Sequence, residues 1–515
     1  MGDADLYDAD LQQIAARGMR ADDVHRQLRQ LRAGCSYRHL ERACGRGDGI
    51  RVLAPSEIER LQDHYQAARA AGRLLKFVPA SGAATRMFKS LLRARERNDA
   101  NREAVAARGD AEAHELLQFM DGFARFAFAE DLRHLMQANG LDAAALAARG
   151  CFGEIIDYLL APHGLDYAAL PKGLVRFHRY ATGSRTAFEE HLREAAGYLC
   201  DDRGVYRLHF TISPQHRERF AALLGELALA LEQQLGVRFE VGFSEQKPST
   251  DTVAVGLDNR PFRTDDGRLL FRPGGHGALI ENLNDLAADI VCINNIDNVL
   301  PDYRQPIVIK WRQALIGLLV AVQREIFAHL SALDQPAAGA AAVGAAARFV
   351  QQQLALEVTG SEAEQRAALT AVLDRPLRVC GVVANAGEPG GGPFWVRGPQ
   401  GRLSVQIVEG AEVDPASPAQ QAVFRSASHF NPVDLVCGVR DRRGRSFELS
   451  RFVDPEAVFI AHKSEAGRNL KALERPGLWN GAMARWITLL VEVPATTFCP
   501  VKTVTDLLRP QHQPE

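Results

Sequence analysis

Two kinds of segment alternate through the middle of the chain, and this alternation limits the possible folds more than any other feature. Apolar runs suited to β-strands recur, and between them lie segments with the spacing of amphipathic helices. The strand-like runs lie at 74–80, 205–213, 237–246 and 289–295, and the helix-like segments lie at 185–199, 215–235 and 278–288. Strands that alternate with helices are typical of a mainly parallel sheet covered by helices. The pattern therefore predicts an α/β fold.

The length of the chain suggests how these elements are organised. At roughly 100 to 200 residues per domain, 515 residues predict two or three domains. We expect a helical N-terminal extension over 1–72, an α/β domain over 73–375 with a helical insertion at about 90–170, and a C-terminal α+β part over 376–515. The last residues, from Pro510, are expected to form a frayed tail.

Charge and composition exclude several classes of partner. Lys and Arg total 61 against 63 Asp and Glu, so no global positive field would attract nucleic acid or an anionic membrane. The acidic N-terminus lacks the pattern of a secretory signal, and eight cysteines without a C-x-x-C pair indicate reduced thiols, so we expect a cytoplasmic protein. The apolar run at 314–322 is too short to span a membrane and predicts a buried helix segment. The oligomeric state stays open.

The first candidate site follows the strand-like run at 74–80. Small residues from Ser81 to Ala84 would let a ligand approach backbone N–H groups, whose dipoles suit phosphate, and Arg86 adds a permanent charge. A tight connection between a strand and a helix, with Arg86 in solvent, would show the same residues.

Two further candidates lie near the run at 289–295. Gly274 to Gly277 surround His276 at the start of a helix, where the backbone could wrap around a ligand, or where an ordinary turn would suffice. Asn294 to Asn298 directly follow an apolar strand, and ligands of parallel sheets bind at the carboxyl ends of strands. Asp297 there could hold Mg2+ together with substrate phosphates, or could merely cap the next segment.

The remaining candidates lie in the C-terminal third. The glycines at 390–392 precede a Phe-Trp pair and suit close approach to a sugar, although a hairpin turn explains them equally well. Lys502 lies between apolar residues in the segment 498–508 and could contact phosphate. Alternatively, Thr503 or Thr505 caps a helix there and Lys502 is solvated.

Seven segments, in one order, carry a resemblance to a known family. They are ASGAATRM, PKGL at 171–174, FSEQ at 243–246, RPGGHG, NNIDN, GEPGGGPFW and FCPVKTVTDLL. Together they resemble the UDP-sugar pyrophosphorylases, and chains of this size with these segments look most like the DUF4301 family. The resemblance spans roughly 74–508. It implies a glycosyltransferase-A-like (Rossmann-like) fold with a mainly parallel mixed sheet.

The resemblance also implies roles for individual residues. The catalytic charges would be Arg86, Lys172 and Lys502, and Asp297 would bind Mg2+. The nucleotide would contact Ser81, Gly82, Ala83, Thr85, Gln246, Gly275 and His276. The sugar would contact Asn295, Glu388, Gly391 and Gly392.

The chain departs from the family pattern at three positions. Ser81 and Ala84 stand where glycines are usual, and Ala278 stands where the uridylyltransferases usually have Asp. These changes affect the shape of the nucleotide loops, so the base preference is the least determined property.

The expected reaction joins a nucleoside triphosphate, with UTP favoured, to a sugar 1-phosphate and releases pyrophosphate. Such a transfer needs positioning and charge neutralisation rather than a nucleophilic side chain. One alternative is a protein that binds a nucleotide sugar without turnover, although binding alone would not require all four charged residues. Another is a glycosyltransferase on the same fold, but those enzymes generally use a D-x-D motif, and NNIDN offers a single Asp.

Overall fold

The computed structural model describes residues 6–34, 36–98, 101–335, 339–387, 390–398 and 401–514. The chain forms two compact units, and each is assembled from separate stretches of sequence. Unit 1 comprises Met1–Phe77, Ser244–Ile293 and Gln313–Ala495, and unit 2 comprises Val78–Phe243, Asn294–Arg312 and Thr496–Glu515. This division differs from the three consecutive parts at 1–72, 73–375 and 376–515, because contacts between distant segments, and not sequence order, decide which residues form one compact body.

The largest sheet of unit 1 is mainly parallel. Its strands are, in spatial order, β2 (Gly45–Arg46), β3 (Gly49–Arg51), β19 (Ile487–Glu492), β12 (Leu377–Ala384), β16 (Asp434–Gly438), β11 (Ile290–Asn294) and β4 (Leu74–Pro79). Parallel pairing joins β2 to β3, β3 to β19, β19 to β12 and β11 to β4, whereas β16 is antiparallel to β12. Every residue of β11 and β16 is buried, as expected for a sheet covered on both faces. The predicted α/β fold is confirmed.

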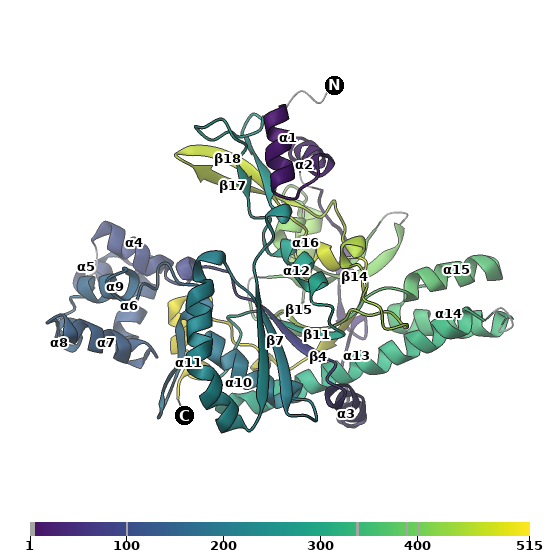
Figure 1. Ribbon diagram of the computed structural model, residues 1–515, viewed down its shortest axis with the longest axis horizontal. Coiled ribbons are helices and arrows are strands. Elements are labelled where there is room, and N and C mark those ends of the chain that lie inside the picture. Colours follow the sequence, from purple (N-terminus) through teal and green to yellow (C-terminus); the bar gives the residue numbers. More distant parts are fainter. Residues whose placement is uncertain are drawn as a thin grey trace. The chain divides into compact units, whose positions relative to one another are not determined.

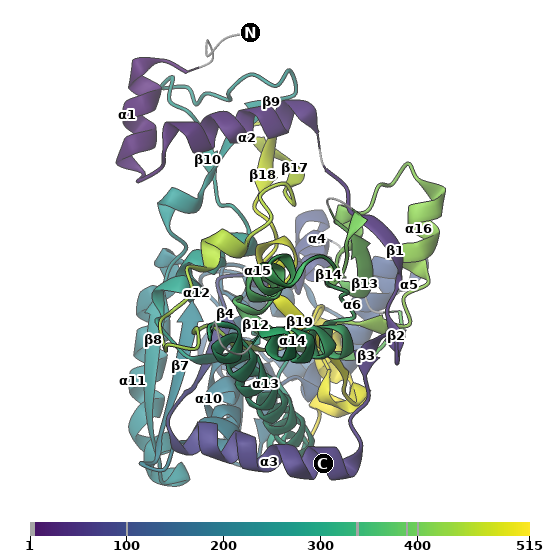
Figure 2. The same cartoon turned by 90° about the vertical axis from the view of Figure 1, so that its right-hand side faces the viewer.

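Two smaller antiparallel sheets complete the strands of unit 1. One consists of β1 (His39–Ala43), β13 (Gly392–Arg397) and β14 (Leu403–Val408), and the other of β10 (Phe271–Arg272), β9 (Thr252–Gly256), β18 (Arg468–Glu474) and β17 (Phe459–Glu465). The short strand β15 (His429–Phe430) pairs with β12. Helices α1 (Asp8–Ala16) and α2 (Ala21–Ala33) lie beside β9 and β10 (Figure 2), and Val24 and Leu28 share a buried cluster with Val253 and Val255.

The predicted helical extension over 1–72 is therefore only partly helical. It contains α1, α2 and α3 (Pro55–Ala70), but β1, β2 and β3 lie between α2 and α3. These strands are short, and β1 is stabilised by pairing with β13, as in His39 opposite Arg397. A partner so far along the chain leaves no periodic signal near residue 40.

The other helices of unit 1 are α12 (Ile280–Asp285), α14 (Gly339–Leu354), α15 (Glu362–Leu373), α16 (Pro418–Arg425) and most of α13 (Gln305–Leu333). In Figure 1, α14 and α15 run next to each other on the right. By length and composition the region Asp302–Leu333 is apolar enough to cross a membrane, but 61% of its most apolar window is buried inside the protein. Ala314, Leu315 and Ile316 have no exposed surface, which confirms the buried helix segment predicted at 314–322.

Unit 2 holds the strands β7 (Val205–Thr211) and β8 (Arg238–Ser244), the hairpin β5 (Arg176–Tyr180) and β6 (Gly183–Thr186), and helices α10 (Ala187–Leu199) and α11 (Arg217–Leu235). The insertion predicted at about 90–170 is helical, as expected. It consists of α4 (Lys89–Arg97), α5 (Arg102–Arg108), α6 (Ala111–Gly122), α7 (Ala129–Ala138), α8 (Ala143–Ala148) and α9 (Gly153–Leu160), which gather into one group (Figure 1).

The C-terminal residues are packed, contrary to the predicted frayed tail. His512, in a 3-10 turn at Pro510–His512, is 1% exposed. Its Nδ1 lies 2.8 Å from Nε2 of His178, whose Nδ1 lies 2.9 Å from a carboxylate oxygen of Glu190. This buried chain of polar groups fixes the end of unit 2, and its members are too far apart in sequence to form a recognisable motif.

Candidate functional site

The first candidate loop lies in unit 2, directly after β4. Ser81, Gly82, Ala83, Thr85 and Arg86 are all exposed. A Cβ built on Gly82 would meet no atom within 4 Å, so a ligand can approach the backbone there. The sequence departure at Ala84 has a packing role, because this residue is fully buried and begins a 3-10 turn, Ala84–Arg86.

Backbone contacts fix this loop against the segment that carries Lys172. The Ala84 N–H donates to the carbonyl of Leu170 at 3.0 Å, and Ala83 forms a β-bridge with Pro171. The Lys172 N–H then donates to the carbonyl of Gly82 at 3.4 Å. Arg86 forms no ion pair with any residue in the described part of the chain, so its charge is available to a ligand.

Lys172 and Lys502 share the carboxylate of Asp297. The Nζ atom of Lys172 lies 2.8 Å from Oδ2 of Asp297, and Nζ of Lys502 lies 3.1 Å from the same oxygen. The Lys172 ammonium also donates to the carbonyl of Val501 at 2.7 Å. Three residues predicted to handle phosphate and metal, separated by 125 and 205 positions in the sequence, therefore form one cluster in unit 2. We call it the Lys172–Asp297–Lys502 cluster.

Burial and charge act against each other in this cluster. The side chains of Asp297 and Lys172 are 9% and 12% exposed, whereas that of Lys502 is 43% exposed. Burial would raise the pKa of Asp297, but the charges of Lys502 and Lys172 outweigh it and hold that pKa below its ordinary value. Burial lowers the pKa of Lys172, although Asp297 opposes the shift. The carboxylate is thus kept ionised by its neighbours.

The second oxygen of Asp297 is a candidate metal ligand. Oδ1 is buried and has no hydrogen-bond partner among the described residues. Within the described part of the chain, no three His, Cys, Asp or Glu residues gather as a metal site. Mg2+ commonly uses one or two carboxylates and takes its other oxygens from water and substrate phosphates. A single carboxylate with an unpartnered oxygen fits that mode of binding.

The segment that carries Lys502 is held by contacts at three places. The Val501 N–H donates to the Asp297 carbonyl at 3.0 Å, and the Val504 N–H donates to the carbonyl of Met87 at 2.9 Å. Thr503 caps the 3-10 helix Val504–Leu508, and Oδ2 of Asp506 accepts from the N–H groups of Lys502 and Thr503 at 2.7 Å each. The cap at Thr503 is therefore confirmed, but Lys502 is not simply solvated, because its Nζ contacts Asp297.

Asp506 is the positioning residue that sequence reasoning missed. It is 8% exposed and orients the backbone on which Lys502 sits. The pattern Thr503-x-x-Asp506 is a capping box, which the sequence could have revealed.

His276 and its flanking glycines lie in unit 1 and are tightly packed. The His276 ring stacks on Trp479 with centroids 4.4 Å apart, and its Nδ1 accepts from the Leu478 N–H at 3.1 Å. Gly275 has φ of 76°, and a Cβ on Gly277 would lie 2.0 Å from the carbonyl oxygen of Pro476. Packing within unit 1 thus accounts for much of this glycine pattern. Ala278, the third departure, is fully buried.

The remaining candidates are spread over both units. Gln246 lies in unit 1, and its Nε2 is buried without a hydrogen-bond partner among the described residues. Gly391 and Gly392 also lie in unit 1, where a Cβ on either would come within 2.8 Å of a neighbouring side chain. Asn295, in unit 2, accepts from the Asn298 N–H in the turn that presents Asp297. Glu388 lies outside the described residues.

Comparison with known proteins places the chain in a family. The family described as "Domain of unknown function (DUF4301)" matches residues 7–513. The chain belongs to the DUF4301 family. A search by sequence found no match among curated proteins.

Solved structures similar to this DUF4301 protein include three pyrophosphorylases. UDP-glucose pyrophosphorylase from Leishmania major is 11% identical, with a TM-score of 0.44 over 97% of this chain and 77% of that chain. UDP-N-acetylglucosamine pyrophosphorylase from Trypanosoma brucei is 13% identical, with a TM-score of 0.47 over 98% of this chain and 79% of that chain. A putative UDP-N-acetylglucosamine pyrophosphorylase from Entamoeba histolytica is 10% identical, with a TM-score of 0.40 over 87% and 79%.

Proposed function

We propose that this DUF4301 protein is a nucleotidyltransferase that forms a nucleotide sugar and pyrophosphate from a nucleoside triphosphate, with UTP favoured, and a sugar 1-phosphate. The observation that carries the proposal is the Lys172–Asp297–Lys502 cluster, in the unit that also holds the exposed loop 81–86. Two ammonium groups, the exposed guanidinium of Arg86 and an accessible backbone suit a ligand with several phosphates.

The protein residues would act by position and charge. A sugar phosphate oxygen attacks the α-phosphorus of the triphosphate in line, pyrophosphate leaves, and no protein nucleophile is needed. Arg86 and Lys172 would offset charge on the triphosphate, and Lys502 would meet the sugar phosphate. The half-exposed ammonium of Lys502 can exchange Asp297 for substrate more easily than the buried one of Lys172.

Asp297 would hold Mg2+ through Oδ1, which has no hydrogen-bond partner among the described residues. When bound, the cation would supply further neutralisation of the phosphates. We also propose that the nucleotide contacts Ser81, Gly82, Ala83, Thr85, Gln246, Gly275 and His276. Asn295, Gly391 and Gly392 are proposed to contact the sugar.

The reaction can be tested directly. The purified chain with Mg2+ is incubated with each nucleoside triphosphate and a panel of sugar 1-phosphates, and pyrophosphate release is measured. We expect release with at least one pair, and with UTP fastest. If all pairs are silent while nucleotide sugars still bind, the protein is a binding protein; transfer of sugar from a nucleotide sugar to an acceptor would identify a glycosyltransferase.

Variants of the lysines test the roles within the site. Lys172→Met and Lys502→Met should each lower kcat/KM by about 100-fold, the scale of losing one charged contact to the transition state. Lys502→Met should affect the sugar phosphate more than the nucleotide. Lys310→Met is the matched control, since Lys310 is exposed on α13 in the same unit. Rates equal to the control in both lysine variants would remove the cluster from the active site.

A further inference from the structure

A second candidate site is a cavity that lies wholly within unit 1. It has a volume of about 1260 Å³, and its lining comes from segments around β1, β3, β13, β14 and β19 and from the end of α14. Ligand pockets commonly span roughly 300 to 1,000 Å³, so a nucleotide-sized molecule would fit. None of the described residues proposed above for nucleotide, sugar or metal lines this cavity.

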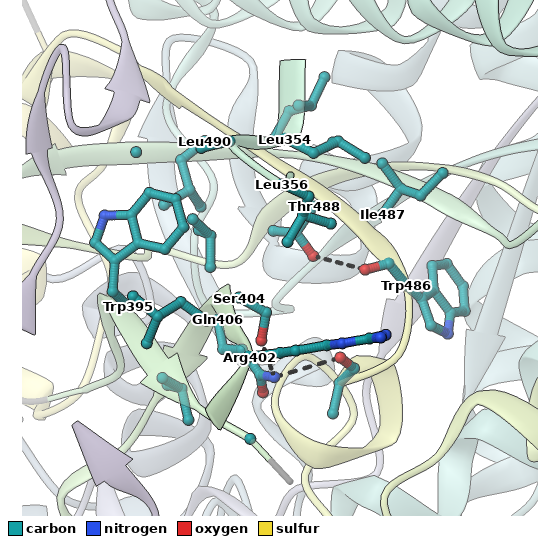
Figure 3. Close-up of a pocket in the computed structure, with 18 of the residues that line it drawn as sticks. Leu354, Leu356, Trp395, Arg402, Ser404, Gln406, Trp486, Ile487, Thr488 and Leu490 are labelled. Atoms are coloured by element: carbon teal, nitrogen blue, oxygen red, sulfur yellow. Dashed lines mark hydrogen bonds between the residues drawn. The ribbon is translucent and has the colours of Figure 1, made fainter. Parts of the chain in front are cut away.

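The lining combines an apolar part with a polar one. In Figure 3 the side chains of Leu354, Leu356 and Leu490 lie along the upper part of the view, and Arg402, with two polar neighbours, lies along the lower part. Trp395 and Trp486 lie at the two ends of the view (Figure 3). Such a lining suits a ligand that has both an apolar or planar body and a polar head.

The charge of the lining is positive. Six arginines and three carboxylates line the cavity. Two of the carboxylates lie near cations of their own, because Asp454 pairs with Arg38 at 2.5 Å and Glu57 raises the pKa of Arg51 against the effect of burial. The third carboxylate, Glu456, accepts from Nε2 of Gln30 at 3.4 Å, and Arg397 pairs with Glu41, which does not line the cavity. The positive excess therefore rests on the remaining three arginines.

Three arginines carry this excess, namely Arg375, Arg402 and Arg485. None of them forms an ion pair within the described part of the chain. The Arg375 side chain donates to the carbonyl of Ala371 at 2.7 Å. Burial, and then the positive charges of Arg485 and Arg402, lower the pKa of Arg375, so the three guanidinium groups repel one another.

A further polar group in the lining lacks a partner. Trp486 is 5% exposed, and its Nε1–H has no hydrogen-bond partner among the described residues. A buried indole N–H normally finds an acceptor, and leaving it unsatisfied is costly. An anionic ligand could supply that acceptor.

We propose that this cavity binds a small organic phosphate, with the phosphate between Arg375, Arg402 and Arg485 and the apolar body against the leucines and Trp486. A phosphate dianion offsets more of the three charges than a carboxylate does, and its oxygens match guanidinium groups in bidentate pairs. This site shares no residue with the Lys172–Asp297–Lys502 cluster, and the proposal stands whether or not the chain is a nucleotidyltransferase.

The test uses three probes on the full-length chain, measured by isothermal titration calorimetry: 1-naphthyl phosphate, inorganic phosphate and 1-naphthol. We expect 1-naphthyl phosphate to bind most tightly, because it alone satisfies both parts of the lining. Inorganic phosphate binding as tightly as 1-naphthyl phosphate would show a site for free phosphate and overturn the organic ligand. Equal binding of 1-naphthol would show an apolar groove without anion recognition and would overturn the proposal.

Charge variants locate the binding. Arg402 and Arg485 are exposed, so Arg402→Gln and Arg485→Gln should leave the thermal midpoint of unfolding nearly unchanged. Each should weaken 1-naphthyl phosphate by roughly tenfold, as expected for one charge-assisted hydrogen bond. Arg425→Gln, at an exposed arginine of α16 outside the lining, is the matched control and should bind as the unchanged chain does. Loss of binding in Lys172→Met but not in the arginine variants would assign the phosphate to the other site and overturn the proposal.

Discussion

The two groups of cations differ in how their charge is balanced. In unit 2, Lys172 and Lys502 share the buried carboxylate of Asp297. In unit 1, Arg375, Arg402 and Arg485 line a cavity without an ion pair to any described residue. The first group carries its own counter-charge, and the second would be balanced only by a ligand.

This difference changes what each cation contributes to folding. Removing the shared carboxylate of the cluster leaves two ammonium groups, one of them buried, without compensation. Removing one cation from the cavity instead relieves repulsion between like charges. Similar-looking basic sites should therefore respond to charge-removing mutations with opposite signs of stability change.

The largest expected effect comes from Asp297→Asn. The substitution keeps the shape of the side chain but leaves Lys172 and Lys502 facing each other, so the free energy of unfolding should fall by about 3 kcal/mol. Urea unfolding measures this. Asp157→Asn is the control, because its ion pair with Arg95 is about 40% exposed on both sides and should cost less than about 1 kcal/mol. Equal effects of the two substitutions would mean that the cluster stabilises the folded protein no more than a surface ion pair does.

The pH dependence of the stability difference between the original chain and Asp297→Asn tests the balance of charge in the cluster. The pKa of Asp297 is lowered in the folded protein, so between its folded value and its ordinary value of 3.8 the unfolded chain binds more protons. The stabilisation is therefore full above pH 3.8 and is lost as the pH falls through the folded pKa. We expect the difference between the original chain and Asp297→Asn to stay constant from about pH 7 to pH 5.

The original chain and the Asp297→Asn variant should both become less stable below pH 6.5, because burial lowers the pKa of His512 below its ordinary value of 6.5. The difference between them, and not the stability of either, is therefore the quantity to compare at each pH. A difference that already shrinks between about pH 7 and pH 5 would contradict a lowered pKa for Asp297.

The smallest expected effects are changes in the free energy of unfolding that have opposite signs for two similar substitutions. Arg485→Gln should raise the free energy of unfolding by about 0.3 kcal/mol, because it removes one of three like charges. Lys502→Gln should lower it by about 0.5 kcal/mol, because it removes an attraction that is partly screened by solvent. Thermal unfolding at low salt compares the two. Stability changes of the same sign would show that negative charge in the protein already compensates the arginines of the cavity.

Much of the fold could be predicted from local patterns. The strand-like run at 289–295 became β11, and the helix-like segment at 215–235 became α11, because apolar periodicity reports directly which face of an element is buried. The strands β1 to β3 were missed because each is short and because β1 and β3 pair with strands far along the chain. The two interleaved units and the packing of His512 also depend on contacts between distant segments, so local patterns did not predict them.

The candidate site was predictable in its residue types but not in its arrangement. Lys172, Asp297 and Lys502 were identified through motifs, and the structure brings the three together. Arg86 lies on the loop that follows β4, and backbone hydrogen bonds join this loop to the segment that carries Lys172, as between the Ala84 N–H and the Leu170 carbonyl. His276 and its glycines are packed within unit 1. A glycine required for close backbone packing has the same sequence signature as one required by a ligand, so the sequence does not distinguish the two roles.

By itself the sequence determined the α/β class, the helical insertion, the family and the charged residues of the cluster, since these follow from periodicity and from motifs of neighbouring residues. Only the tertiary structure decided that one carboxylate serves two lysines and that three arginines line a cavity without an ion pair to any residue that the structure describes. The physical reason is that the state and strength of a charge depend on burial and on the nearest opposite charge, and folding sets both by joining residues hundreds of positions apart.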